Sequence, residues 1–192
     1  MLLSSAQKKT ELLSIEMKPP LILLSDLWGN EKSDWLNYYQ ELLEPVFDLK
    51  YYDCCELGKI DKKSLNEEII HSQFINGGIE RASEKLLELE KDKVDIIAFS
   101  IGGTIAWKAG LKGLKINNLY AISSTRLRYE TNKPNCTIKL HFGGKDLFKP
   151  DSTWFKNMKV PYEIKENGEH QIYREKEFSR KVCDEIITHY NT

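Results

Sequence analysis

The sequence has few cysteines, no long apolar run and no excess of charge of either sign. Its four cysteines include one adjacent pair, and none of them has the spacing of metal ligands. Lysine and arginine number 28 and aspartate and glutamate 29, which excludes the electrostatic footprint of a nucleic-acid or anionic-membrane protein. No apolar run approaches the roughly 20 residues that a membrane-spanning helix needs. The composition therefore favours a protein without nucleic-acid or membrane partners.

The cysteines and the first residues of the chain indicate a cytoplasmic protein. We interpret Cys54, Cys55, Cys136 and Cys183 as reduced thiols, and we expect neither a metal site nor a cofactor. Residues 1–9 lack a basic segment followed by a long apolar one, so we expect no signal peptide.

The length and composition predict one globular domain. The chain has 192 residues, of which 41% are hydrophobic and 30% charged, which is enough for a proper core. Residues 1–18 are mixed in character, and we expect a tail or an edge element there. The prolines Pro19 and Pro20 mark a break. We place a single domain at residues 19–192.

Short apolar segments alternate with amphipathic ones along the chain. Strands are predicted near residues 21–24, 47–52, 94–99, 116–123, 137–142 and 160–165, and helices over 33–44, 79–91, 101–110, 151–158 and 178–190. Residues 56–76 have no clear pattern and are expected to be a loop with a short helix. This alternation is typical of an α/β fold, with a doubly wound, mostly parallel sheet of about six strands and helices on both faces.

One serine lies between a buried strand and a helix. Residues 94–99 are apolar apart from Asp95, a pattern typical of a central parallel strand that is covered on both faces. Ser100 follows directly, and Gly102 and Gly103 come next. Small residues suit a sharp turn at which a helix packs closely on a strand. The alternative interpretation is that Ser100 only caps the helix.

The segment Ala98-Phe99-Ser100-Ile101-Gly102 resembles the nucleophile elbow of the α/β-hydrolase fold family, with alanine in place of the first glycine. Residues 141–146 resemble the Gly-x-x-Asp turn that holds the catalytic acid of that family, and residues 166–170 resemble its catalytic-histidine loop. The order Ser, Asp, His is also the order of the family.

The resemblance implies a catalytic triad. Ser100 would be the nucleophile, His170 the general base and then acid, and Asp146 the residue that orients the imidazole. Asp151 and Glu169 remain alternatives for the acid. Each of the three triad residues follows a predicted strand, as a site beyond the carboxyl ends of an open sheet requires.

The resemblance also implies two backbone N–H donors for an oxyanion. One is expected at Ile101 and the other at Leu27, with Trp28 as the second choice. The family often has His-Gly in the loop after the first strand, whereas this chain has Ser25-Asp26. A carboxylate aimed at an oxyanion would slow the reaction, so we expect Asp26 to point away or to be held locally.

Two further positions are candidates for substrate binding. Trp28 would form a wall of the acyl pocket, or it is simply part of the core. Arg126 and Arg128 follow the fourth predicted strand and would hold an acidic group of the substrate or the acidic face of a carrier protein. Alternatively, both arginines are solvated loop residues.

The resemblance implies a small serine hydrolase of the carboxylesterase or thioesterase class. Its substrate would be a small-molecule ester or an acyl thioester, including one linked to an acyl carrier, and it would react through an acyl-enzyme. Only about a dozen residues separate the fourth and fifth predicted strands, so we expect no lid there. A catalytically inactive binding protein of the same fold is the alternative that Ser25-Asp26 supports. A Rossmann-type nucleotide-binding domain ranks last, because no G-x-G-x-x-G follows the first strand.

Overall fold

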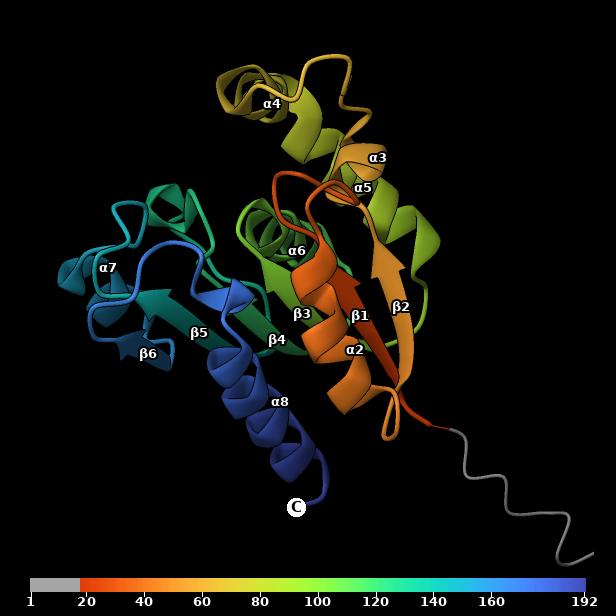
Figure 1. Ribbon diagram of the computed structural model, residues 1–192, viewed down its shortest axis with the longest axis vertical. Helices are drawn as coiled ribbons and strands as arrows, with labels where there is room; N and C mark the ends of the chain where they lie inside the picture. The colour runs from red at the N-terminus through yellow and green to blue at the C-terminus, as the bar shows by residue number, and fades with distance from the viewer. Residues whose placement is uncertain (1–17) are drawn as a thin grey trace, which may run out of the picture.

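The computed structural model describes residues 18–192. The strands are β1 (Pro20–Leu24), β2 (Asp48–Tyr52), β3 (Val94–Phe99), β4 (Ile116–Ile122), β5 (Thr137–Gly143) and β6 (Tyr162–Lys165). They form one sheet in the order β2-β1-β3-β4-β5-β6, and every neighbouring pair is parallel (Figure 1). The tail or edge element predicted at 1–18 lies, apart from Lys18, outside the described residues.

The central strands are apolar on both faces because both faces are covered. In β1, Leu21 and Leu23 pack into one core and Ile22 and Leu24 into the other, and all four side chains are fully buried. Strand β3 pairs with β1 on one side and with β4 on the other. A strand in such a position cannot alternate between apolar and polar residues, as the continuous run at 94–99 indicates.

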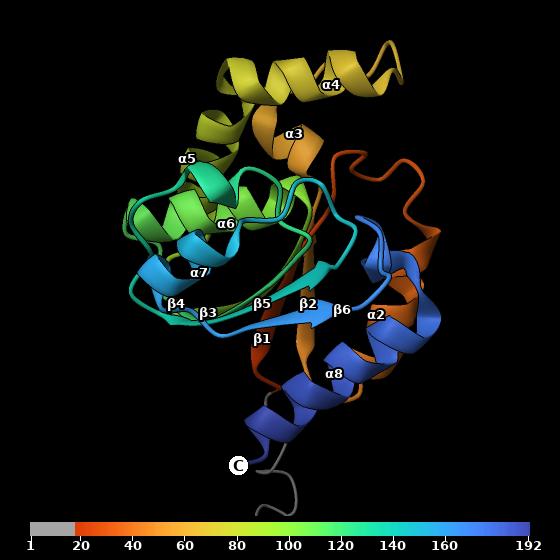
Figure 2. The same ribbon diagram turned by 90° about the vertical axis from the view of Figure 1, so that its left-hand side faces the viewer.

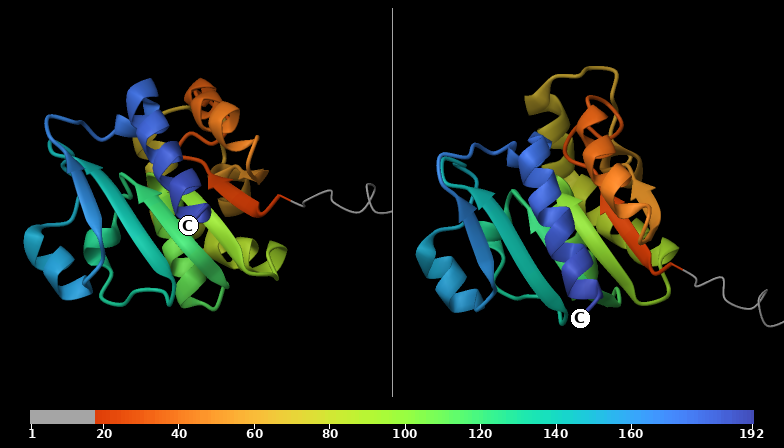
Figure 3. Two further views of the ribbon diagram at one scale, coloured as in Figure 1. Left: turned by 90° about the horizontal axis from the view of Figure 1, so that it is seen from below. Right: turned by 60° about the horizontal axis from the view of Figure 1, so that its bottom comes forward.

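Helices lie on both faces of the sheet. They are α2 (Asn37–Leu43), α3 (Cys54–Gly58), α4 (Glu67–Gln73), α5 (Ile79–Leu89), α6 (Ile101–Leu111), α7 (Ser152–Met158) and α8 (Lys176–Tyr190). Figure 2 shows α5, α6 and α7 on one side of the sheet and α2 and α8 on the other. In Figure 3, α8 crosses one face of the twisted strands. The predicted doubly wound fold is confirmed, and the sheet is parallel throughout.

Residues 56–76 contain more helix than the sequence predicted. Helix α3 is followed by α4, whose first turn is capped by the Asn66 side chain, which accepts a hydrogen bond from the N–H of Ile69 at 3.1 Å. A π-helical turn (Phe74–Gly78) then kinks at Gly77, where φ is 102° and glycine is favoured. Helix α4 projects beyond the sheet at the top of Figure 1.

The connection between β4 and β5 contains only a short 3-10 turn, η3 (Leu127–Tyr129), so no lid is inserted there. Another short turn, η4 (Ile172–Arg174), precedes α8. Within residues 18–192, no helix combines the length and the apolarity that crossing a membrane requires.

A cavity of about 390 Å³ lies at the amino ends of the central strands. Pro19 and Val94, at the starts of β1 and β3, line it together with Asn117 of β4 and Tyr190 at the end of α8. Ser100 follows the carboxyl end of β3, so this cavity and Ser100 lie at opposite ends of the sheet.

Candidate active site

Ser100 lies on a strained turn between β3 and α6. Its φ of 49° and ψ of −117° fall outside the regions that most residues adopt, and its side chain makes no capping hydrogen bond to α6. The alternative interpretation, that the Ser100 side chain caps the following helix, is therefore wrong. A Cβ at Gly102 would lie 2.5 Å from the carbonyl oxygen of Ser25, and one at Gly103 would lie 1.7 Å from Oγ of Ser124. The turn needs glycine at both positions.

The structure brings Ser100, His170 and Asp146 together at the carboxyl end of the sheet. Oγ of Ser100 is 3.0 Å from Nε2 of His170, and Nδ1 of His170 is 2.9 Å from Oδ2 of Asp146. Both distances lie in the hydrogen-bonding range that a general base and its orienting carboxylate require. Asp146 and Ser100 are 1% and 4% exposed, so both residues are buried.

The loop after β5 reaches His170 because Gly143 lets two backbones touch. A Cβ at Gly143 would lie 2.3 Å from the carbonyl oxygen of Glu169. The N–H of Lys145 also donates to the carbonyl of Gly168 at 2.9 Å. Oδ1 of Asp146 accepts from the N–H of Phe148 at 2.8 Å, which leaves Oδ2 for the imidazole.

The two alternative acids do not contact the imidazole. Oδ1 of Asp151 accepts from the N–H of Trp154 at 2.7 Å and caps α7. Glu169 is exposed, and its side chain makes no hydrogen bond within the described part of the chain. Asp146 is the carboxylate that the geometry pairs with His170.

Two backbone N–H groups are available near Ser100. Ile101 is the first residue of α6, so its N–H has no partner inside the helix. The N–H of Leu27 donates no hydrogen bond among residues 18–192. The N–H of Trp28 instead donates to Oδ1 of Asp26 at 2.9 Å, which favours Leu27 over Trp28 as the second donor.

Asp26 is fully occupied by local partners. Besides the N–H of Trp28, its carboxylate accepts from the hydroxyl of Tyr173 at 3.1 Å and from Nη2 of Arg174 at 2.7 Å. Asp26 is 1% exposed. The carboxylate is therefore held locally, as expected for an acidic residue next to the predicted oxyanion donors.

A cavity of about 430 Å³ opens beside Ser100. Its wall is formed by Leu27, Trp28, Glu67, Glu68, His71, Thr125, Phe148, Gln171 and Tyr173, with Ser100 and His170. Trp28 lies in the wall and is also largely buried, so both predicted roles are compatible with its position. The pKa of His71 is lowered by burial and by Arg126.

The sequence did not predict that α4 contributes part of the cavity wall. The available signal was Asn66 followed by Glu67 and Glu68, a helix start with acidic residues in its first turn. Phe148 was also missed, although it lies two residues after the predicted acid. Its ring meets that of His170 edge-on at 5.3 Å between centroids.

Neither arginine predicted at the rim lines this cavity. Arg126 lines a neighbouring cavity with Glu80 and Lys108. Nη1 of Arg128 donates to the carbonyl of Phe148 at 2.8 Å and so holds the loop beside His170.

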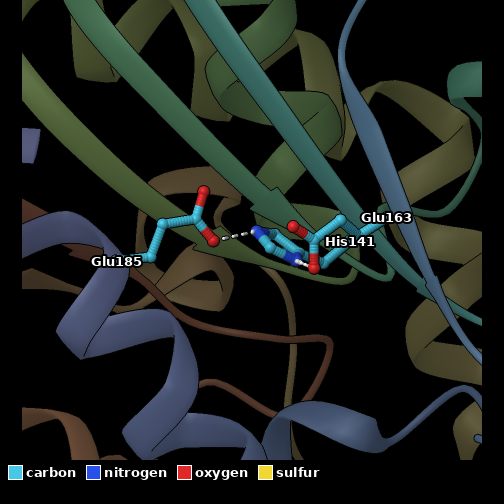
Figure 4. A group of neighbouring side chains, drawn as sticks. All are labelled: His141, Glu163 and Glu185. Carbon is cyan, nitrogen blue, oxygen red and sulfur yellow. Dashed lines mark ion pairs between the residues drawn. The ribbon is translucent and has the colours of Figure 1, made fainter.

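One group of side chains outside the site has donors that metals use. His141, Glu163 and Glu185 each place a ligand atom within 4.8 Å of the others (Figure 4). His141 is buried, with Nδ1 3.9 Å from Glu163 and Nε2 3.6 Å from Glu185, on opposite edges of the ring. Lys139 binds both carboxylates, at 2.8 and 3.3 Å, and Lys181 binds Glu163 at 2.6 Å, so two lysines already compensate the two negative charges.

The buried cysteines are poor candidates for a nucleophile. Burial raises the pKa of Cys55 and of Cys183 to about 12, and it also raises that of Cys54. A thiol in such surroundings stays protonated and unreactive.

No protein-family model and no curated protein matches the chain. Solved structures do. A protein described as a hydrolase of the α/β superfamily from Xanthomonas campestris has a TM-score of 0.66 and 14% identity, over 90% of this chain and 99% of its own. The monoacylglycerol lipase of Paleococcus ferrophilus has a TM-score of 0.63 and 13% identity, over 90% and 97%.

Est1E from Butyrivibrio proteoclasticus, solved with ferulic acid bound, has a TM-score of 0.65 and 11% identity, over 92% of this chain and 90% of its own. At such low sequence identity, the similarity of the structures is evidence for the fold alone. Together with the parallel six-stranded sheet and the turn at Ser100, this similarity shows that the chain has the α/β-hydrolase fold.

Proposed function

We propose that this protein is a serine hydrolase that cleaves a carboxylic ester or thioester through an acyl-enzyme. The observation that carries the proposal is the continuous path of hydrogen bonds from Ser100 through His170 to Asp146. A serine hydroxyl is a weak nucleophile until a base takes its proton, and this arrangement supplies that base. A hydrolase, a carboxylesterase and a monoacylglycerol lipase among proteins of similar fold agree with it.

In the first half of the reaction, Oγ of Ser100 attacks the carbonyl carbon while Nε2 of His170 takes the hydroxyl proton. The carboxylate of Asp146 holds Nδ1–H of His170 and stabilises the imidazolium. The N–H groups of Ile101 and Leu27 donate to the oxyanion. The tetrahedral intermediate then collapses: the leaving group takes the proton from Nε2, and the acyl group stays on Ser100.

In the second half, water replaces the leaving group. His170 takes a proton from that water as it attacks the acyl-enzyme, and it returns the proton to Oγ of Ser100 when the acid departs. Because only a neutral imidazole accepts a proton, activity should fall in acidic solution.

The departure at Ser25-Asp26 favours an inactive binding protein, whereas the local hydrogen bonds of Asp26 favour an active enzyme. With its oxygens bound by Trp28, Tyr173 and Arg174, the carboxylate does not compete for the oxyanion. The aromatic rings of Trp28 and Phe148 in the cavity wall favour an acyl or leaving group with an apolar part. Both simple esters and acyl thioesters, including carrier-linked ones, fall within the proposal.

The test is labelling with a fluorophosphonate probe, followed by turnover of p-nitrophenyl esters and acyl thioesters. Wild-type protein should be labelled, and Ser100→Ala should lose both labelling and turnover, because the nucleophile is gone. The conservative control is Ser124→Ala, a buried serine outside the cavity wall, which should keep both. Folded wild-type protein that is neither labelled nor active would contradict the proposal.

A further inference from the structure

A buried carboxylate links two loops of the site that share no backbone hydrogen bond. One loop, residues 25–29, follows β1 and contains the donor Leu27. The other, residues 168–174, follows β6 and contains His170. Strands β1 and β6 are not neighbours in the sheet. Among the described residues, no backbone hydrogen bond joins these two loops. Their relative position therefore depends on side chains.

Asp26 fixes the loop that contains Leu27. Its Oδ1 accepts from the N–H of Trp28, and its own carbonyl accepts from the N–H of Gly29 at 3.3 Å and from the hydroxyl of Ser25 at 3.1 Å. The carbonyl of Leu27 accepts from the thiol of Cys55 at 3.2 Å. The peptide groups on both sides of Leu27 are thus held, while its N–H has no hydrogen-bond partner among residues 18–192.

Oδ2 of the same carboxylate reaches the other loop. It accepts from the hydroxyl of Tyr173 and from Nη2 of Arg174, three and four residues after His170. Tyr173 is itself fixed, because its carbonyl accepts from the hydroxyl of Tyr39 at 3.0 Å. Its ring meets that of His170 edge-on at 6.2 Å between centroids.

We infer that Asp26 is a positioning residue, which sets the oxyanion donor Leu27 and the general base His170 at a fixed distance through Tyr173 and Arg174. The inference rests on the proposed function. The inference assigns a role to Asp26, which stands in this chain where the α/β-hydrolase family often has the glycine of His-Gly. Misplacing a catalytic group by as little as 1 Å costs about a hundredfold in rate. The side chain of Asp26 is 1% exposed and accepts hydrogen bonds on both carboxylate oxygens, so it holds the two loops rigidly, as a precise catalytic geometry requires.

Two conservative variants test the inference. Asp26→Asn replaces one carboxylate oxygen by an NH₂ group, so it loses the bond from either the N–H of Trp28 or Nη2 of Arg174, because neither of these groups can accept a hydrogen bond. Tyr173→Phe removes only the hydroxyl. For Asp26→Asn, kcat on a p-nitrophenyl ester should fall by about 10- to 100-fold, with KM changed by less than about threefold, because the loss is felt in the transition state. Tyr173→Phe should lower kcat by a smaller factor.

The double variant shows whether the two residues act through one connection. Once Asp26→Asn has broken the link, adding Tyr173→Phe should lower kcat by less than about twofold more. The chain offers a matched control in Glu90, a carboxylate with 5% exposure at the end of α5, which is bound by the hydroxyl of Tyr52 and by Lys50 of the edge strand β2. Glu90→Gln and Tyr52→Phe should lower the melting temperature and leave kcat unchanged.

The inference is overturned if folded Asp26→Asn keeps the wild-type kcat, or if the effects of Asp26→Asn and Tyr173→Phe on kcat simply multiply. It is also overturned if Glu90→Gln lowers kcat as much, since a general loss of stability would then explain the effect. Wild-type protein without turnover would instead count against the proposed function, so the two failures are distinguishable.

Discussion

At the scale of single residues, the backbone conformation at the end of each strand decides which side chains reach the site. Ser100, Asp146 and His170 follow strands and meet. Arg126 also follows a strand, yet its backbone turns into the left-handed region at φ 68° and its side chain lines another cavity. Position in the chain decides the edge of the sheet at which a residue lies. Local backbone conformation then decides its direction, and no pattern in the sequence around Arg126 indicates it.

The buried imidazole of His141 should make the stability of the fold depend on pH. Its pKa is lowered from 6.5 to about 4, chiefly by burial and also by the nearby charges of Lys139 and Lys181. The carboxylate of Glu163 acts in the opposite direction and raises the pKa. In the unfolded chain this histidine takes a proton below pH ~6.5, whereas in the folded chain it stays neutral until pH ~4. Stability should therefore fall by about 3 kcal/mol as the pH is lowered between these values.

The measurement is urea unfolding of wild type and His141→Gln at several pH values between 7 and 4. The glutamine cannot be protonated, so the loss of stability with falling pH should be smaller in the variant than in the wild type. His189→Gln, a substitution of an exposed histidine, is the control and should keep the wild-type slope. Equal slopes for His141→Gln and wild type would contradict the prediction.

At the scale of elements, periodicity was enough for the six strands and for the helices that pack against the sheet. A short helix was expected within residues 56–76, but α4 could not be placed because it does not pack on the sheet. Ile70 is the one buried residue of this helix, and its neighbour Ile69 is exposed. Such a segment has no clear apolar stripe, and its position over Ser100 follows from tertiary contacts that no short pattern encodes.

Fraying α4 should change substrate binding more than chemistry. Asn66→Ala removes the cap of a helix whose residues line the cavity, at a cost of about 1 kcal/mol in helix stability. We expect KM for a bulky ester to change by severalfold with kcat nearly constant. Asp151→Ala removes the cap of α7, which does not line the cavity, and should leave both constants unchanged. A large fall in kcat for Asn66→Ala alone would show that α4 acts on the triad.

At the scale of the whole molecule, two cores share one sheet. Leu23 belongs to the core under α2 and α8, and its neighbour Ile22 to the core under α5 and α6. Leu23→Ala and Ile22→Ala should each cost about 2–5 kcal/mol. Because the strands connect both cores, each variant should still unfold in a single transition. Far-ultraviolet circular dichroism and tryptophan fluorescence should give coincident urea curves, and separated curves would indicate that the cores unfold independently.

The cavity at the amino ends of the strands bears on how the chain can be re-engineered. Pro19 and Tyr190 share its wall, at the end of the sheet away from Ser100. A short linker between those positions would close the chain into a ring, which could be reopened at the exposed Gly113, where no neighbouring atom lies within 4 Å of an added Cβ. Such a circular permutant keeps every loop of the triad covalently intact. The same end of the molecule suits attachment to a surface, with the nucleophile directed toward solution.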